Sequence, residues 1–362
     1  MTFGISVDAA AWRGHCDAFR DRVYAADAAL IPVIKGNGYG LGQELLAREA
    51  ARLGVHAIAV GSIHEVASIV DAFAGDVVVL EPIDPRDEVA SAAWCQHIDA
   101  GLDGRLIRTV ASPEGLDFVL DTQPDARVII EAGTSMHRFG LSGSALREAW
   151  DWAGQAQSEG RLRLLGLTVH LPLRPSAAEY DEILQLVDDI GDDNVHLLVS
   201  HLDAASVEIL RRHKPNLRVS LRVGTALWLG LRGALHPHGT VLAANRVQKG
   251  TSIGYQRRKT RRDGYVLVVA GGTSHGIALS APSPATSMRQ RVISLAIGVL
   301  DAFGRARSPF SWNRRPLWFV EPPHQHVSML WLPASVTPPA IGAELDADVR
   351  YTITRADVVV LR

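Results

Sequence analysis

The sequence predicts an α/β protein: a parallel (β/α)8 barrel of the TIM type, followed by a mainly β C-terminal domain. Short apolar runs rich in valine and isoleucine alternate with longer amphipathic stretches through the first two thirds of the 362 residues. Runs this short and this continuously apolar are typical of strands that are buried on both faces of a parallel sheet. After about Leu235 helical patterns become scarce and β-rich pieces follow one another, which indicates a second domain.

The first part of the chain contains eight candidate strands. They are, in order, Ala29–Ile34, Val55–Val60, Val77–Leu80, Leu106–Val110, Arg127–Ile130, Leu164–Val169, Val195–Val199 and Leu217–Leu221. Helical patterns separate several of them, namely Gln43–Leu53, Ile63–Phe73, Pro113–Leu120 and Ala177–Ile190. Eight strands with helical spacers favour the barrel. A doubly wound open sheet is the alternative, because Leu106–Val110 also fits a loop.

The second part of the chain is typical of a β domain. Its candidate strands are Thr240–Val247, Tyr265–Val269, Val292–Val299, Leu317–Val320, Val327–Trp331 and Val349–Leu361. We place the boundary near Gly233–Gly239, with the barrel in residues 1–235 and the β domain in residues 236–362. Phe3–Val7 is an extended apolar piece before the first helix, and it is a candidate to pair with the β domain rather than with the barrel.

The amino-acid composition indicates which binding partners and which cellular compartment to expect. The chain is 47% hydrophobic and 21% charged with a formal net charge of −2, which gives no reason to expect a nucleic acid or an acidic membrane as a partner. Cys16 and Cys95 are too few for a disulfide framework, which fits a reducing cytosol. We find neither a signal peptide nor an apolar run of the roughly 18 residues that span a bilayer. We therefore expect a soluble cytoplasmic protein.

Polar and charged residues follow the ends of the predicted strands. In a barrel of this type the working groups lie at the C-terminal ends of the strands and in the loops after them. Here these positions hold Lys35, Glu131, Arg138, His170, Ser200, His201, Arg222 and Gly224. This clustering predicts a single site at one end of the barrel.

Lys35 is the residue with the sharpest chemical signal. It ends a buried apolar strand and is followed by the glycine-rich stretch Gly36–Gly40. Burial lowers the pKa of an ammonium group, and Schiff-base chemistry requires a neutral amine. The structural alternative is a lysine that extends its charged end out of the strand mouth into water.

The segment Lys35–Gly42, which reads KGNGYGLG, resembles the cofactor-binding motif of alanine racemases, Lys-Ala-Asn-Ala-Tyr-Gly-His-Gly. Gly36 and Gly38 replace the two alanines, and Leu41 replaces the histidine. The resemblance implies that Lys35 binds pyridoxal 5′-phosphate (PLP) as a Schiff base and that Tyr39 contacts the phosphate.

The resemblance continues through the barrel. Met136–Gly140 is similar to the family's Met-x-Arg-Leu-Gly segment, so Arg138 would contact the cofactor's phenolic oxygen and the substrate carboxylate. His170 matches the histidine beside the pyridine ring. The stretch Arg222–Ala226 resembles the Arg-x-Gly-Ile-Ala segment, whose arginine faces the pyridine nitrogen. The resemblance adds two cofactor-binding residues next to this arginine, Gly224 and Thr225.

Three segments of the β domain also resemble the family. Gly250–Tyr255 aligns with the segment that ends in the second catalytic base, so Tyr255 would reach in from the partner subunit. Met329 would offer its backbone amide to the substrate carboxylate, and Tyr351 would contact the phosphate. The resemblance implies a homodimer with shared active sites that racemises alanine or another small amino acid with two bases, Lys35 and Tyr255. Taken singly, Tyr255, His170 and Tyr351 also fit structural roles.

Four departures from the family pattern leave the substrate open. Glu131 stands where the family commonly has a supporting lysine, often carbamylated. Its carboxylate can supply the same negative charge, so we expect it to orient Arg138 by a charge-assisted hydrogen bond. Asp203 stands at the position of a phosphate-binding serine and would repel the phosphate, so Ser200 or His201 is the expected substitute. Ala270–Gly276 replaces a Gly-Tyr-Ala-Asp-Gly segment. Leu330 stands where an aspartate follows the methionine.

Two rival functions remain. His324 and His326 lie after a Pro-Pro pair and form a His-x-His spacing that can bind zinc or manganese. D-threonine aldolases and D-serine dehydratases share this architecture and bind a divalent metal near the C-terminus, whereas two histidines in a Pro-rich turn are the structural alternative. The third hypothesis is a non-catalytic PLP-binding homologue, against which the presence of Arg138 and Tyr255 argues.

Overall fold

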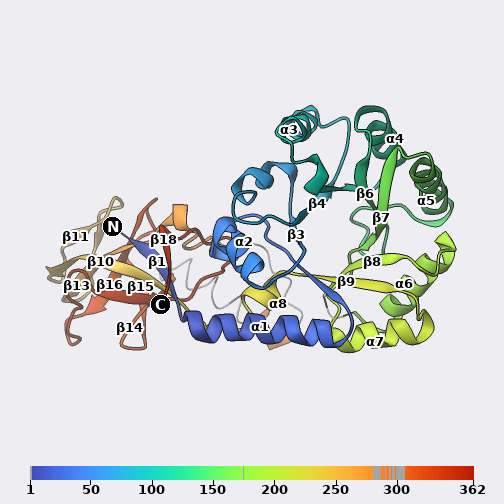
Figure 1. The fold of residues 1–362 in the computed structure, drawn as a ribbon. Coiled ribbons are helices and arrows are strands. Elements are labelled where there is room, and N and C mark those ends of the chain that lie inside the picture. Colours follow the sequence, from blue (N-terminus) through green and yellow to red (C-terminus); the bar gives the residue numbers. More distant parts are fainter. Residues whose placement is uncertain are drawn as a thin grey trace. The chain divides into compact units, whose positions relative to one another are not determined.

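The chain folds into two compact units. The computed structural model of the protein describes residues 2–173, 175–279, 287–289, 291–292, 295, 298 and 306–362. One unit comprises Arg13–Gly230, and the other comprises Met1–Trp12 together with Leu231–Arg362 (Figure 1). We call them the barrel unit and the β unit.

The barrel unit is built on an eight-stranded parallel sheet in the order β2-β9-β8-β7-β6-β5-β4-β3. The strands are β2 (Ala29–Pro32), β3 (Ala57–Val60), β4 (Asp76–Pro82), β5 (Leu106–Val110), β6 (Ala126–Ala132), β7 (Leu162–Val169), β8 (His196–Ser200) and β9 (Arg218–Val223). A parallel bridge between Val33 and Ala59 joins the two ends of the sheet. The barrel prediction is confirmed, and Leu106–Val110 is a strand.

Helices flank the parallel strands on the outside of the barrel unit (Figure 1). They are α1 (Ala9–Ala25), α2 (Gln43–Arg52), α3 (Glu88–Asp99), α4 (Pro113–Thr122), α5 (Gly143–Ser158), α6 (Ala177–Ile190), α7 (Ala204–His213) and α8 (Thr225–Trp228). Their ends follow local sequence signals. Ser176 and Glu179 form a capping box at the start of α6, and Gly191 ends that helix with a left-handed backbone.

The stretch Ile63–Phe73, expected to be an α-helix, is instead a short 3-10 helix, Ile63–Ser68, followed by turns. Ile63, Val66 and Ile69 are fully buried and recur every three residues. That spacing matches the three residues per turn of a 3-10 helix better than the 3.6 residues of an α-helix. The three-residue spacing of these apolar residues in the sequence is therefore consistent with a 3-10 helix.

The interior of the barrel is filled by side chains from most of its strands. The buried cluster consists of Ile31, Val33, Ala59, Val78, Ile107, Ile129 and Leu198. Because the strands are parallel, their C-terminal ends share one rim. At that rim the indole nitrogen of Trp228 donates a hydrogen bond to the Val33 carbonyl oxygen at 2.9 Å, two residues before Lys35. This contact ties the segment after β9 to the segment that carries Lys35.

The β unit contains an eight-stranded sheet in the order β13-β16-β15-β14-β17-β10-β1-β18, with a further pairing of β13 to β10. The strands are β1 (Phe3–Val7), β10 (Leu235–Val247), β13 (Gly264–Ala270), β14 (Arg307–Trp312), β15 (Arg315–Phe319), β16 (Val327–Pro333), β17 (Glu344–Ala347) and β18 (Val358–Leu361). A hairpin of β11 (Ser252–Ile253) and β12 (Arg258–Lys259) adds a small second sheet. The first strand, β1, pairs antiparallel with β10 and parallel with β18.

Two of the expected β pieces do not coincide with described strands. Of Val349–Leu361 only Val358–Leu361 forms a strand, because the chain turns at residues 351–353. The piece Val292–Val299 lies mostly outside the described residues.

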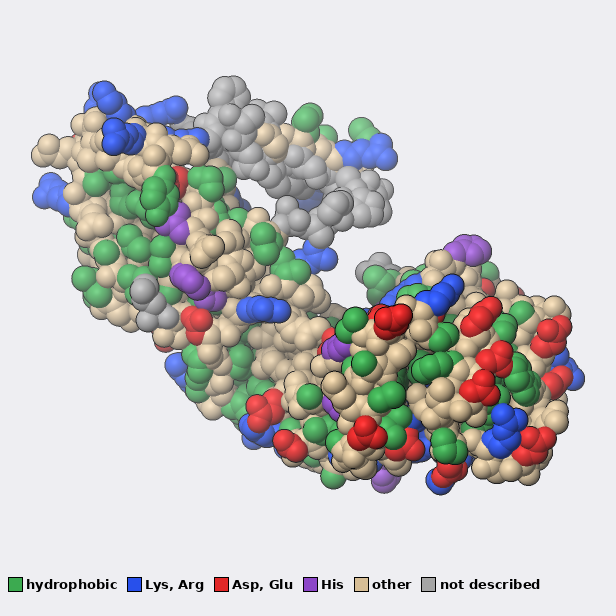
Figure 2. Space-filling model, turned by 90° about the horizontal axis from the view of Figure 1, so that it is seen from above, with side chains coloured by type: hydrophobic (Ala, Val, Ile, Leu, Met, Phe, Trp, Pro, Cys, Tyr) green, Lys and Arg blue, Asp and Glu red, His purple; other side chains and the backbone are tan. Residues whose placement is uncertain are grey.

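The surfaces of the two units differ in charge. Figure 2 shows Lys and Arg side chains gathered at one edge of the β unit and Asp and Glu side chains spread over the barrel unit. The basic run after Tyr255 contains five exposed side chains, Arg257, Arg258, Lys259, Arg261 and Arg262. Among the described residues, no helix is both long enough and apolar enough to cross a membrane.

Candidate active site

The C-terminal rim of the barrel brings the predicted barrel residues together. Lys35 follows β2, Arg138 lies in the loop after β6, His170 follows β7, and Arg222 lies near the end of β9. The charges of Arg138 and Arg222 both lower the pKa of Lys35, and Arg222, Arg138 and Lys35 all lower the pKa of His170. These mutual effects require the four side chains to share one electrostatic environment.

The loop that carries Lys35 is held by a residue that the sequence did not reveal. Glu65 accepts a hydrogen bond from the amide of Gly36 at 2.9 Å through Oε1 and from the amide of Gly61 at 2.7 Å through Oε2. The carboxylate thereby joins the end of β3 to the residue next to Lys35. Nothing in the sequence marked Glu65, since one acidic residue in an apparent helix is common.

Lys35 is exposed at the rim, yet its surroundings lower the pKa of its ammonium group. Partial burial is the main factor that lowers the pKa of Lys35, and the positive charges of Arg138 and Arg222 lower it further. The negative charge of Glu65 raises the pKa of Lys35 and so partly offsets these effects. A lowered pKa is the direction that Schiff-base chemistry requires, because that chemistry uses the uncharged amine.

Tyr39 and Gly224 meet although they are far apart in the sequence. Tyr39 has a left-handed backbone, with φ at +53°, and its side chain is buried. A Cβ atom at Gly224 would overlap the hydroxyl of Tyr39, so only glycine fits there. Burial raises the pKa of Tyr39 to about 12, which keeps the hydroxyl protonated as a hydrogen-bond donor. Both residues are thus close together, as a shared phosphate site requires.

The two glycines that replace the family's alanines stand where the backbone of this loop favours glycine. Gly36 and Gly38 have φ angles of +63° and +60°, a region that favours glycine. A Cβ atom at Gly38 would also lie 2.5 Å from the backbone nitrogen of Gln43. The loop conformation in this chain therefore depends on its own glycines.

His170 and Ser200 form a hydrogen-bonded pair at the rim. The Ser200 hydroxyl lies 2.8 Å from Nδ1 of His170 and accepts a hydrogen bond from the Leu171 amide at 3.2 Å. Burial, with contributions led by Arg222, lowers the pKa of His170 to about 4, so the ring is neutral near pH 7. The hydroxyl hydrogen of Ser200 can then point to Nδ1, which leaves Nε2 as the donor of the ring.

His201 lies beside this pair. The rings of His170 and His201 are 5.4 Å apart between centroids, and His201 has a left-handed backbone with φ at +62°. Burial and the charges of Arg222 and Lys35 lower the pKa of His201. Because Ser200 is already engaged with His170, His201 is the more available of the two expected substitutes for the phosphate-binding serine.

Asp203 has a structural role. It is the N-terminal cap of α7, where it accepts hydrogen bonds from the amide of Ser206 at 2.9 Å and from the Ser206 hydroxyl at 2.6 Å. These hydrogen bonds lower the pKa of Asp203 and keep it charged. An aspartate at this position is therefore explained by the helix that follows.

Arg222 is a buried charge of the site. Its side chain donates one hydrogen bond through Nη2 to the Val169 carbonyl oxygen at 2.9 Å. Within the described part of the chain, Nε of Arg222 is buried and has no hydrogen-bond partner. Burial lowers the pKa of Arg222 to about 10, which still leaves the group charged near pH 7. A buried donor without a partner is costly, so this atom is a candidate contact for a ligand.

Glu131 lies in the electrostatic field of both arginines. It is buried in β6, and burial raises its pKa, while Arg222 and then Arg138 counteract this rise. Among the described residues, Arg138 acts on Glu131 only through its charge and not through a hydrogen bond, and the Arg138 guanidinium lies 5.1 Å from the ring centroid of Phe139. The direct hydrogen bond expected between Glu131 and Arg138 is thus absent from this conformation.

The remaining predicted residues belong to the β unit. The Tyr255 side chain is 85% exposed, and Met329 lies in β16 opposite Val268. Tyr351 is buried, its hydroxyl donates to the Leu235 carbonyl oxygen at 3.4 Å, and burial raises its pKa to about 12. Leu330, which replaces an aspartate, is fully buried in the core of the β unit.

The altered glycine-rich segment Ala270–Gly276 packs against the His-x-His segment. Gly271 donates to the His326 carbonyl oxygen and Thr273 to the His324 carbonyl oxygen, both at 2.9 Å. A Cβ atom at Gly272 would overlap that same His324 carbonyl. The altered glycine-rich segment and the His-x-His segment are therefore held together by backbone hydrogen bonds.

The two histidines of the His-x-His segment have separate partners. Nε2 of His324 lies 2.8 Å from Oε1 of Glu321, whereas Nδ1 of His326 lies 3.3 Å from the Ser274 hydroxyl. In the described residues, no group of three or more His, Cys, Asp or Glu side chains is arranged to hold a metal ion.

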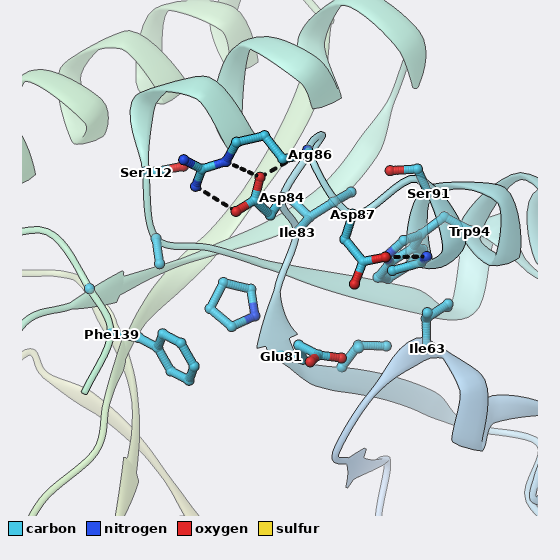
Figure 3. A pocket seen from close by; sticks show the side chains of 15 residues that line it. Ile63, Glu81, Ile83, Asp84, Arg86, Asp87, Ser91, Trp94, Ser112 and Phe139 are labelled. Carbon is cyan, nitrogen blue, oxygen red and sulfur yellow. Dashed lines mark hydrogen bonds and ion pairs between the residues drawn. The ribbon is translucent and has the colours of Figure 1, made fainter.

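A pocket of about 410 Å³ lies beside the rim, at the ends of β4 and β5 (Figure 3). Asp84 and Arg86 form an ion pair on one side of it, with Nη2 of Arg86 2.6 Å from Oδ2 of Asp84. Phe139, which follows Arg138, lies on the opposite side, and Gly140 also lines the pocket. None of the described residues predicted for the site lines this pocket, so the predicted site follows the rim.

The sequence is similar to that of known proteins. Residues 7–231 match the family described as alanine racemase, N-terminal domain. The chain is 27% identical to the alanine racemase of Thermobifida fusca over 72% of each chain.

Solved structures share the fold. The structure of alanine racemase from Bartonella henselae with covalently bound pyridoxal phosphate has a TM-score of 0.71 at 14% identity and covers 100% of both chains. Histidine racemase from Leuconostoc mesenteroides has a TM-score of 0.64 at 15% identity, over 94% of this chain and 87% of its own. Because the family match spans more than half of the chain, the protein belongs to the alanine racemase family through its N-terminal domain.

Proposed function

We propose that the protein is a PLP-dependent isomerase that racemises a small amino acid, with alanine as the first candidate. Membership of the alanine racemase family supports the enzyme class. The observation that carries the proposal is the buried Arg222, whose Nε has no partner among the described residues. An acceptor on a planar ring, such as a pyridine nitrogen, would satisfy this donor.

Residues of the rim offer the chemical groups that the cofactor needs. Lys35 offers an exposed amine with a lowered pKa. Tyr39 and Gly224 form the close pair to which we assign the phosphate, and His170 is a neutral ring that we assign to one face of the pyridine. We assign further phosphate contacts to Ser200, His201, Thr225 and Tyr351.

When bound, PLP supplies an electron sink for the charge that remains after the α-proton leaves. Arg222 would donate a hydrogen bond to the ring nitrogen and would retain its own proton, since even its lowered pKa of about 10 exceeds neutral pH. Because Arg222 would give up no proton to the ring nitrogen, it would limit how far the charge spreads. Rapid return of a proton to the α-carbon is then favoured over transamination.

Racemisation needs one base on each face of the substrate. We assign these roles to Lys35 and to Tyr255 of the partner subunit, so the proposal includes a homodimer with shared sites. Arg138 and the backbone amide of Met329 bind the substrate carboxylate. Glu131 supports the two rim arginines through its negative charge rather than through the hydrogen bond first expected.

The reaction class can be tested with a panel of amino acids in D2O. We expect deuterium at the α-carbon of alanine or another small amino acid, formation of the other enantiomer, and no effect of EDTA. Release of an aldehyde or keto acid that depends on a divalent metal would instead favour the aldolase or dehydratase. Bound cofactor without any exchange would favour the non-catalytic homologue.

The two free cysteines, Cys16 and Cys95, are consistent with the proposed cytoplasmic location.

A further inference from the structure

A buried carboxylate lies directly beneath the backbone of Tyr255. Glu321 is only 5% exposed. Its Oε2 accepts a hydrogen bond from the Tyr255 amide at 2.8 Å, and its Oε1 lies 2.8 Å from Nε2 of His324. Both carboxylate oxygens are therefore used, one for the backbone of Tyr255 and one for an imidazole.

The same imidazole faces the side chain of Tyr255. The rings of Tyr255 and His324 are 4.7 Å apart between centroids, with an angle of 41° between their planes. Although Tyr255 is 85% exposed, one face of its ring therefore has a fixed neighbour. The hydrogen bond to Glu321 in turn restrains the orientation of that neighbour, because a charge-assisted pair has a defined geometry.

The backbone before Tyr255 is shaped to this carboxylate. Gly254 has a φ of +71°, and a Cβ atom at this position would overlap the carboxylate of Glu321. Any other residue at Gly254 would displace either Glu321 or the turn that presents Tyr255. The contact between Glu321 and the Gly254–Tyr255 backbone therefore depends on the glycine, which an ordinary surface loop would not require.

We infer that Glu321 and His324 are positioning residues for Tyr255, and that they orient its phenol for proton transfer. The inference rests on the proposed function, since it assumes that Tyr255 is the second base. It assigns His324 to Tyr255, through Glu321, in place of a metal ion. Fixing an exposed side chain in advance lowers the entropy lost when it reaches its reacting geometry.

The inference can be tested by measuring α-proton exchange separately from each enantiomer of the substrate in D2O. The Tyr255→Phe variant identifies the enantiomer whose exchange depends on Tyr255, because only that exchange should be lost. We expect Glu321→Gln and His324→Ala to slow that same exchange by about ten- to hundredfold and to leave the exchange served by Lys35 within about twofold. His324→Phe retains a ring beneath Tyr255 and should recover part of the loss. Gln325→Ala, an exposed side chain between the two histidines, is the matched control.

A second measurement does not depend on activity. The chain has six tyrosines, so selective ¹³C labelling of tyrosine rings gives a simple NMR spectrum in which Tyr255→Phe identifies the Tyr255 signal. Stacking on His324 should shift this signal, and His324→Ala should remove the shift.

The possible failures are distinguishable. An unchanged Tyr255 signal in His324→Ala, or an equal loss of exchange from both enantiomers in Glu321→Gln and His324→Ala, would overturn the positioning role. The proposed function would survive either result if Tyr255→Phe remained selective for one enantiomer. If Tyr255→Phe left both exchanges intact, the two-base proposal would fail, and the inference would fail with it.

Discussion

The hydroxyl of Tyr39 lies against the α-carbon of Gly224, so closely that a single methyl group at Gly224 would overlap it. The two residues come from the loops after β2 and β9, which are neighbours in the barrel sheet. This contact joins the first and the last strand of the predicted site. It also explains why a glycine follows Val223 at the rim.

Gly224→Ala should weaken PLP binding. Overpacking of a tight contact costs about 1–3 kcal/mol, which corresponds to roughly ten- to hundredfold in affinity. Gly154→Ala in α5 is the control, since a Cβ atom there meets nothing within 4 Å. The dissociation constant can be obtained by titrating the apoenzymes with PLP and following absorbance. Equal affinities in the two variants would argue against a phosphate site at Tyr39 and Gly224.

Lys35 should hold the cofactor covalently. Borohydride treatment of the yellow protein should attach PLP to the peptide that contains Lys35, as identified by mass spectrometry. Lys35→Ala should lose this attachment, whereas Lys249→Ala, an exposed lysine of the β unit, should retain it. Full covalent trapping in Lys35→Ala would refute the assignment.

Mixed dimers should recover activity that neither parent has. A dimer of one Lys35→Ala chain and one Tyr255→Phe chain has one site with both bases intact if each site is shared between subunits. After random mixing in equal amounts, we expect about a quarter of the wild-type activity. Mixed dimers that are demonstrably formed yet inactive would mean that each chain builds its own site.

Folding stability should fall in mild acid because His170 is held neutral. Its pKa is about 4 in the folded protein and about 6.5 in the unfolded chain. Below pH 6.5 the unfolded state therefore binds a proton that the folded state does not, and stability falls until the pH reaches about 4. The loss amounts to at most about 3 kcal/mol.

This effect can be measured as the free energy of unfolding from pH 7 to pH 4 for the wild-type protein and for His170→Gln. The variant cannot titrate at this position, so its stability should decline less over this range. Parallel curves would show that other groups cause the acid sensitivity.

Arg222→Glu should change the outcome of the reaction. A carboxylic acid in place of the guanidinium can give a proton to the ring nitrogen, which deepens the electron sink. We expect a slower racemisation and the appearance of a keto acid from transamination, both measurable by chromatography. Arg222→Lys retains the positive charge and serves as the comparison. A variant that loses racemisation without gaining any keto acid would weaken the role given to Arg222.

Much of the barrel could be read from the sequence because its signals are local. Strands that are buried on both faces must be short and apolar, so all eight of them stand out, including the doubtful Leu106–Val110. The segment Lys35–Gly42 carries its chemistry in consecutive residues. Placement at strand ends then suffices to predict that Lys35, Arg138, His170 and Arg222 share one rim, since parallel strands of a barrel end together.

Tertiary structure alone decided which polar groups hold these residues in place. Glu65 and Glu321 lie 29 and 66 residues from the amides of Gly36 and Tyr255 that they bind, and no periodic pattern links such pairs. Asp203 could be read only as an obstacle to phosphate until the start of α7 identified it as a helix cap. A hydrogen bond needs two groups within about 3 Å of each other, and for residues far apart in the sequence only the folded chain determines which groups come that close.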